Sequence, residues 1–276
     1  MKKYIRKVIS VILTVIIVVS MFAVGSSAAS SLDVLDLAFV IDTTGSMADD
    51  IEQVQINMEN HLNALEDSGA DFRIAIVDYR DFAERTGDYN DYPYCVQLDF
   101  TDNYETILNA IYSLDLGYGG DDDETVCSAL IDGLSELSWR KGAGKAAILM
   151  GDAAALDPEP FTGYTVDDAA NFLYFNNIDY KEEMRSLSRA VSAEIGGPVT
   201  LFTIATSEDS IADFEYLARE TGGKSYVALE SEEIPEIIDD IIEELPEVIE
   251  DEETSFFDIL WDILSFLLSL LTFQWI

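Results

Sequence analysis

The sequence predicts an α/β fold: a doubly wound, mostly parallel sheet with helices on both faces. Short, almost wholly apolar runs alternate along the chain with longer stretches of helical periodicity. Strands that are apolar on both faces and alternate with helices indicate a parallel sheet covered on both sides. Two of the apolar runs lead into an aspartate. Asp42 follows the first run directly, and Asp152 follows the other after Gly151. Such sheets bind ligands at the carboxyl ends of their strands.

The elements follow from hydrophobic spacing. Residues 48–67 place Ile51, Val54, Met58, Leu62 and Leu65 three or four positions apart, which predicts one long amphipathic helix. By the same criteria, strands are expected at 37–41, 72–79, 95–100, 146–150, 199–205 and 225–229. Further helices are expected at 103–115, 124–137, 166–176, 181–194, 210–220 and 232–245.

Composition limits the class of partner. The chain has 276 residues, 49% of them hydrophobic, which is enough for one sizeable core. It carries 54 acidic against 15 basic residues, a formal net charge of -39. Such charge repels nucleic acid and anionic membrane surfaces and favours cations and basic protein surfaces.

The first 29 residues are typical of an export signal. Four basic residues within the first seven precede an apolar run over 8–24 and the small residues of 25–29. This order predicts a signal peptide cleaved after Ala28 or Ala29. The run is long for a signal, so an uncleaved membrane anchor is the alternative. Both place the rest of the chain outside the cytoplasm, secreted or at the cell surface.

Two cysteines, Cys95 and Cys127, are present. In an oxidising compartment an even pair is a candidate disulfide, and two unrelated buried thiols are the alternative. A bridge would close a loop that contains residues 121–124 and, in the chain-entropy model, stabilise the fold by roughly 3–4 kcal/mol.

The segment after the first strand has the chemistry of a cation site. Asp42, Thr44 and Ser46 alternate along a loop that Gly45 allows to turn tightly, and Asp152 follows a second strand. Hard cations such as Mg²⁺ bind oxygen ligands of these types. Ser46 alone could be a simple helix N-cap. That explanation does not account for the four residues together.

These residues carry a resemblance to a known family. Residues 37–47 (LAFVIDTTGSM) resemble the opening strand and metal-ion-dependent adhesion site of von Willebrand factor A domains, whose pattern is Asp-x-Ser/Thr-x-Ser. Residues 72–82 (FRIAIVDYRDF) and 148–153 (ILMGDA) resemble the family's second strand and the strand ending in its last aspartate. The resemblance covers roughly residues 33–245.

The resemblance implies a divalent ion, Mg²⁺ with Mn²⁺ or Ca²⁺ as alternatives. Its implied ligands are Asp42, Thr44, Ser46, Asp121 and Asp152. Asp121 lies in the third loop, residues 119–125, where Glu124 or Thr125 are the alternatives to it. One coordination position would stay open for a protein partner. Integrin-like members have a threonine in the third loop, whereas this loop is rich in aspartate. An extra carboxylate lowers the charge at the metal and weakens its attraction for an acidic partner residue.

The expected function is an exported, metal-dependent adhesion or protein-interaction module, not an enzyme. The only histidine, His61, falls within a predicted helix, so histidine-dependent nucleophilic catalysis has no second candidate base. A metal-dependent hydrolase using Asp42 and Asp152 is the alternative.

The C-terminal end differs in character from the domain. Residues 246–254 form an acidic linker, and 255–276 are expected to form an apolar helix. Its narrow polar stripe consists of Asp258, Asp262, Ser265, Ser269 and Thr272. Such a helix could lie in a membrane interface, self-associate or pack on its own domain. Membrane contact or self-association is expected, because so much apolar surface rarely stays exposed.

Overall fold

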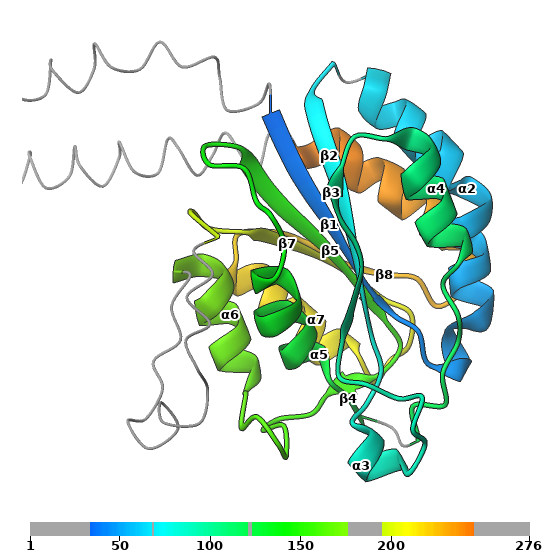
Figure 1. The fold of residues 1–276 in the computed structure, drawn as a ribbon, viewed down its shortest axis with the longest axis vertical. Coiled ribbons are helices and arrows are strands. Elements are labelled where there is room, and N and C mark those ends of the chain that lie inside the picture. The colour runs from blue at the N-terminus through cyan, green and yellow to red at the C-terminus, as the bar shows by residue number, and fades with distance from the viewer. Residues whose placement is uncertain (1–33, 68, 121–122, 176–194, 246–276) are drawn as a thin grey trace, which may run out of the picture.

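A computed structural model describes residues 34–67, 69–120, 123–175 and 195–245 (Figure 1). The expected export signal, the helix at 181–194, the linker 246–254 and the tail 255–276 lie outside these ranges. The predicted fold class is confirmed. The main sheet has the order β3-β2-β1-β5-β7-β8, and every pair is parallel except β2 with β3. Its strands are β1 (Val34–Asp42), β2 (Asp71–Tyr79), β3 (Cys95–Thr101), β5 (Gly144–Gly151), β7 (Thr200–Ala205) and β8 (Ser225–Val227).

Helices cover both faces of the sheet, and Figure 1 shows α2 and α4 on one side and α5, α6 and α7 on the other. One face carries α2 (Ala48–Asp67), α4 (Tyr104–Tyr112) and a helix over residues 234–245. The opposite face carries α5 (Val126–Ser128), which continues into the π-helical turn η3 (Ala129–Gly133), α6 (Val166–Phe175) and α7 (Ile211–Glu220). Short elements are η2 (Gly45–Met47), α3 (Ala83–Thr86), η4 (Ser231–Glu233), β4 (Asp123–Glu124) and β6 (Ala154–Ala155).

The central strand β1 divides its side chains between two cores. Ala38 and Val40 join the cluster under α5, α6 and α7, whereas Leu37, Phe39 and Ile41 join the cluster under α2 and α4. Alternate side chains of a strand point to opposite faces, so a strand buried on both faces must be apolar throughout. Full burial of a Leu- or Phe-sized side chain contributes about 1.5–3 kcal/mol. This burial holds the end of β1, and therefore Asp42, in a fixed place.

The edge strand β3 is antiparallel to β2, with shifts in register along the pair. A parallel return would require a crossover of a dozen or more residues, usually containing a helix that packs on the sheet. The connection from β2 to β3 contains only the four-residue helix α3. It therefore stays at the carboxyl end of β2, beside the end of β1.

The predicted disulfide is absent, because Cys95 and Cys127 are both free thiols. Cys95 begins β3 and pairs with Asp78 of β2. Cys127 belongs to α5 and is fully buried in the core. The predicted helix at 124–137 also begins later, at Val126. Glu124 instead belongs to β4, which pairs in parallel with β6.

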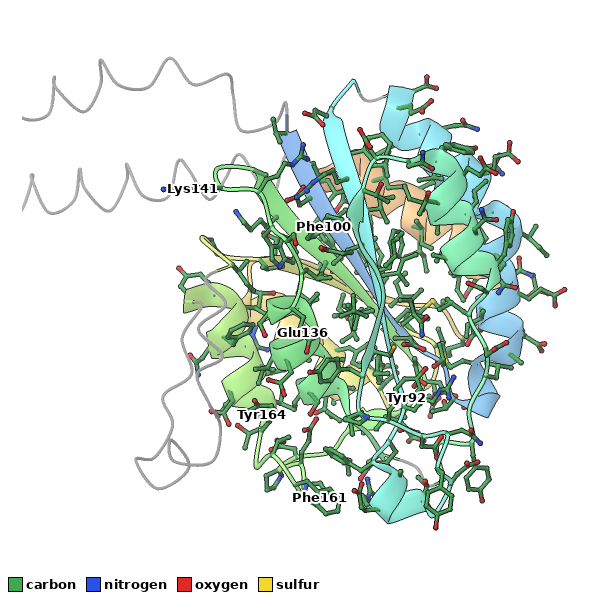
Figure 2. All side chains as sticks on the ribbon, viewed as in Figure 1. Tyr92, Phe100, Glu136, Lys141, Phe161 and Tyr164 are labelled. Carbon is green, nitrogen blue, oxygen red and sulfur yellow. The ribbon has the colours of Figure 1, made fainter. Side chains whose placement is uncertain are left out.

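At the amino end of the sheet, Asp36 is fully buried between two arginines. Its carboxylate accepts from Arg73 Nη2 at 2.7 Å, from Arg140 Nε at 2.8 Å and from the Arg140 backbone N–H at 2.6 Å. Nearby, Phe100 packs edge-on against Trp139, and Figure 2 labels Phe100 at this end of the molecule. Among the residues described, none of the helices combines the length and apolarity needed to cross a membrane.

Candidate metal centre

Asp42 is the last residue of β1 and has no solvent exposure. Its Oδ1 accepts a hydrogen bond from the Thr44 backbone N–H at 2.8 Å, and its Oδ2 has no hydrogen-bond partner within the described chain. Burial, with the nearby charge of Asp152 as a smaller cause, raises the pKa of Asp42 to about 7. A buried polar atom without a partner is costly, so this oxygen is a candidate to bind a group that the described residues do not supply.

The Thr44 hydroxyl lies beside this carboxylate, and the Ser46 hydroxyl lies close to that of Thr44. The oxygens of Thr44 and Ser46 are 3.3 Å apart. Thr44 stands at the N-cap of η2 but makes no side-chain capping bond, so that helical turn does not use its hydroxyl. Thr44 is buried and Ser46 is exposed, and the pair therefore lies between the protein interior and the surface.

Thr43, between Asp42 and Thr44, faces the opposite way. Its hydroxyl donates to Asp78 Oδ2 at 3.0 Å and accepts from Arg80 Nε at 3.0 Å. Asp78 lies in β2, and Arg80 is the first residue after that strand. Contacts from the neighbouring strand β2 therefore fix the loop that carries Thr44. Sequence reasoning missed this role of Arg80. The available signal was a basic residue directly after a strand in a strongly acidic chain.

The end of β5 brings Asp152 to the same place. A Cβ built on Gly151 would lie 3.3 Å from Asp42 Oδ2 and 2.3 Å from the Tyr79 hydroxyl, so only glycine fits here. Asp152, the next residue, is half-buried, and its charge raises the pKa of Asp42. Asp50, in the first turn of α2, is a further buried carboxylate near Asp152. Burial raises the pKa of Asp50, which the sequence reasoning had not selected.

In the third loop, Asp121 lies outside the described residues, but Glu124 and Thr125 are described. Glu124 is buried, and a Cβ on Gly119 would lie 2.7 Å from Glu124 Oε1 and 2.5 Å from Thr44 Cγ2. The Glu124 carboxylate thus lies beside the Thr44 side chain. Thr125 is less suited as a ligand, because its hydroxyl lies 2.6 Å from the Pro93 carbonyl and 2.8 Å from that of Arg80.

The donor set of Asp42, Thr44, Ser46 and Asp152 fits a hard divalent cation, for which oxygen ligands are preferred. In the described part of the chain, no three His, Cys, Asp or Glu side chains are grouped closely enough to hold a metal by themselves. The hydroxyls of Thr44 and Ser46 would therefore have to contribute. A cation would also satisfy the unpartnered Oδ2 of Asp42.

His61 lies in the middle of α2 and is buried. Its Nδ1 is 2.7 Å from Asp239 Oδ1, in the helix over 234–245. This contact connects two helices on one face of the sheet, whereas the carboxylates described above lie at the ends of the strands.

Comparison with known proteins agrees with the fold. Residues 36–163 match the von Willebrand factor A domain. The structure of proximal thread matrix protein 1 from the mussel byssus is similar at 12% sequence identity with a TM-score of 0.52, covering 78% of this chain and 47% of that one. The same mussel protein with a zinc-occupied MIDAS motif is similar at 14% identity and TM-score 0.51, covering 77% and 46%. This chain thus spans about half the length of those structures. No curated protein sequence matches it.

Proposed function

The chain contains a von Willebrand factor A domain, and from this we propose that it is an exported protein-interaction module that binds its partner through a divalent metal ion. The observation that carries the proposal is the buried Oδ2 of Asp42, which has no hydrogen-bond partner among the described residues, in a loop whose Thr44 and Ser46 hydroxyls lie 3.3 Å apart. A carboxylate held in this state costs stability unless a cation joins it.

In this proposal Asp42, Thr44 and Ser46 hold the ion from the first loop and Asp152 holds it from the end of β5, directly or through water. Asp121 is the proposed third-loop ligand, and the buried Glu124 is the alternative. Mg²⁺ is the proposed ion, with Mn²⁺ and Ca²⁺ as alternatives. The zinc-occupied motif of the mussel protein is a reason to test Zn²⁺ as well. The ion supplies a positive charge and an open coordination position for an oxygen of the partner.

The wider organisation is proposed on sequence grounds. Residues 1–29 direct export, 33–245 form the binding domain, 246–254 are a linker, and 255–276 contact a membrane or a second copy of the chain. The partner is a protein and not nucleic acid, because the net charge of -39 repels phosphates. The hydrolase alternative requires a base beside the metal. His61 is buried against Asp239 and is not placed to be that base, so a carboxylate would have to serve.

Titration calorimetry of the full chain with Mg²⁺ and Mn²⁺ tests the proposal. Asp42→Ala should lose most of the divalent-ion affinity and keep the wild-type circular dichroism spectrum. The matched control is Asp67→Ala, which removes an exposed carboxylate at the opposite end of α2 and should bind normally. Unchanged metal affinity in Asp42→Ala would contradict the site. A partner that is captured equally well in Mg²⁺ and in EDTA would contradict the bridging role.

A further inference from the structure

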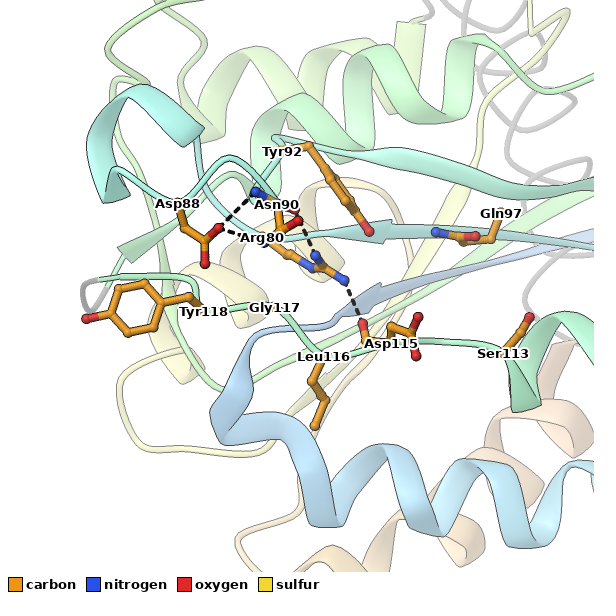
Figure 3. A pocket seen from close by; sticks show the side chains of 10 residues that line it. All are labelled: Arg80, Asp88, Asn90, Tyr92, Gln97, Ser113, Asp115, Leu116, Gly117 and Tyr118. Atoms are coloured by element: carbon orange, nitrogen blue, oxygen red, sulfur yellow. Dashed lines mark hydrogen bonds between the residues drawn. The ribbon is translucent and has the colours of Figure 1, made fainter.

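A cleft of about 770 Å³ opens beside the loop over residues 42–46, which we call the metal loop. Figure 3 shows Tyr92 and Gln97 on one wall, Ser113 and Asp115 on the opposite wall, and Arg80 between them. The wall over residues 115–118 contacts the metal loop directly, because Gly117 N–H donates to the Thr43 carbonyl at 2.7 Å. The cleft and the metal centre therefore share a boundary, although no residue of the cleft is a proposed ligand.

Arg80 does not make the cleft a site for anions. Its Nε donates to Thr43 Oγ1 at 3.0 Å, its Nη1 to the Asn90 carbonyl at 2.9 Å and its Nη2 to the Asp115 carbonyl at 2.6 Å. Its guanidinium also lies over the Tyr92 ring, 4.5 Å from the centroid. Arg80 is buried, and its hydrogen bonds are directed at the walls of the cleft. Its role is to hold the two walls and the metal loop together.

The other polar side chains that line the cleft include both bonded donors and acceptors. The Gln97 side-chain amide donates to Asp78 Oδ1 at 3.1 Å, and the Tyr92 hydroxyl donates to Asp78 Oδ2 at 2.7 Å. The bond from Gln97 uses one of its two amide N–H groups and leaves Oε1 as an acceptor. On the facing wall, Asp115 and Ser113 are both exposed, and Asp115 contributes its carboxylate.

The charge of the cleft is negative. Asp88 and Asp115 oppose the single charge of Arg80 among its lining residues. Asp91 does not line the cleft, but its buried carboxylate lies close to the wall over residues 115–118, because its Oδ1 accepts from the Tyr118 backbone N–H at 3.2 Å. At the rim, the exposed Leu116 and Tyr118 offer apolar surface to a partner. An acceptor-rich, negative cleft with an apolar rim is complementary to a group that carries several N–H donors and a positive charge.

We infer that this cleft binds an arginine or lysine side chain of the partner protein, next to the metal centre. The inference rests on the proposed function for the existence of a protein partner, and it identifies the chemistry of that partner. The cleft does not depend on the metal for its shape, because Arg80 holds its two walls together through hydrogen bonds to the Asn90 and Asp115 carbonyls. A partner would thus present a basic side chain beside the oxygen that it offers to the ion.

Saturation-transfer NMR of the full chain with Nα-acetyl-arginine methylamide tests the inference. The citrulline analogue, which has the same shape without the charge, is the ligand control. Binding of the arginine probe is expected in the millimolar range and should weaken with added salt. Asp115→Asn should weaken it roughly threefold, as expected for a largely exposed ion pair. Asp67→Asn, the same change at the far end of α2, should leave it unaltered.

The titration is repeated in EDTA, where arginine binding should persist. Failure of the metal proposal is measured by calorimetry with Mg²⁺, so the two can fail separately. The inference is overturned if the citrulline analogue binds as well as the arginine probe, if neither binds, or if Asp115→Asn matches the wild type. Because the Asp115 side chain is exposed and Arg80 uses only its backbone carbonyl, the variant should fold normally.

Discussion

Asp36 and Asp42 lie on the same strand, β1, and both are fully buried, yet their surroundings are opposite. Near the amino end of β1, Asp36 is enclosed by the guanidinium groups of Arg73 and Arg140. At the carboxyl end, Asp42 has one oxygen bonded to a backbone N–H and one oxygen without a partner in the described residues. Two arginines neutralise the carboxylate of Asp36, whereas that of Asp42 has no such ion pair among the described residues and is the proposed ligand of a cation.

The difference separates a structural carboxylate from a functional one. A buried charge is tolerated when it is paired and hydrogen-bonded. Where the pairing group is missing, the fold gives up stability, and a site for a ligand is the usual reason. The next three predictions test this distinction, beginning with the largest expected effect.

Asp36→Asn should destabilise the fold by about 3 kcal/mol, because it leaves two arginines without their buried countercharge. Metal affinity should not change, since Asp36 lies at the opposite end of β1 from Asp42. Chemical denaturation gives the free energy of unfolding, and calorimetry gives the metal affinity. An Asp36→Asn variant as stable as the wild type would contradict the role of Asp36 as a carboxylate that stabilises the fold.

Metal affinity should depend on pH because of Asp42. Its pKa is raised to about 7, and the carboxylate must lose its proton to bind the ion. Below about pH 7 the affinity should therefore fall, by roughly tenfold per pH unit when one proton is released. Calorimetry in buffers of different ionisation enthalpy measures the number of protons released when the ion binds. Metal binding that is independent of pH between 5 and 8, approximately the range over which this group titrates, would exclude Asp42 as the titrating ligand.

Asp132 is an intermediate case, with a smaller expected effect. It accepts from the Tyr164 hydroxyl at 2.8 Å, and burial together with the charge of Glu136 raises its pKa to about 6. The folded-state pKa exceeds the ordinary aspartate value of 3.8, so the folded chain binds more protons between these two pH values and its stability falls as pH rises through this range. Asp132→Asn should be slightly more stable than wild type at pH 7 and equal to it near pH 4. Thermal melts at both pH values test this, and an equal difference at both would contradict it.

The sequence predicted those parts of the molecule that depend on local pattern. The helix Ala48–Asp67 followed from spacing, because hydrophobic periodicity is a local property. The joint role of Asp42, Thr44 and Ser46 as metal ligands stays a prediction. The direction of β3 was not predictable in the same way, since it depends on how the connection after β2 packs. The absence of the disulfide and the contacts of Arg80 depend likewise on distant segments.

The short ladder between β4 and β6 has a practical consequence for engineering. Asp123 pairs with Ala154, Glu124 pairs with Ala155, and the Leu156 N–H donates to the Glu124 carbonyl at 2.8 Å. The loop that carries Glu124 and the segment that follows Asp152 are thus fastened to each other as well as to the sheet. In a chimaera with a domain of similar fold, either segment transplanted alone would lose its strand partner. The two segments should be exchanged together, as a single cassette.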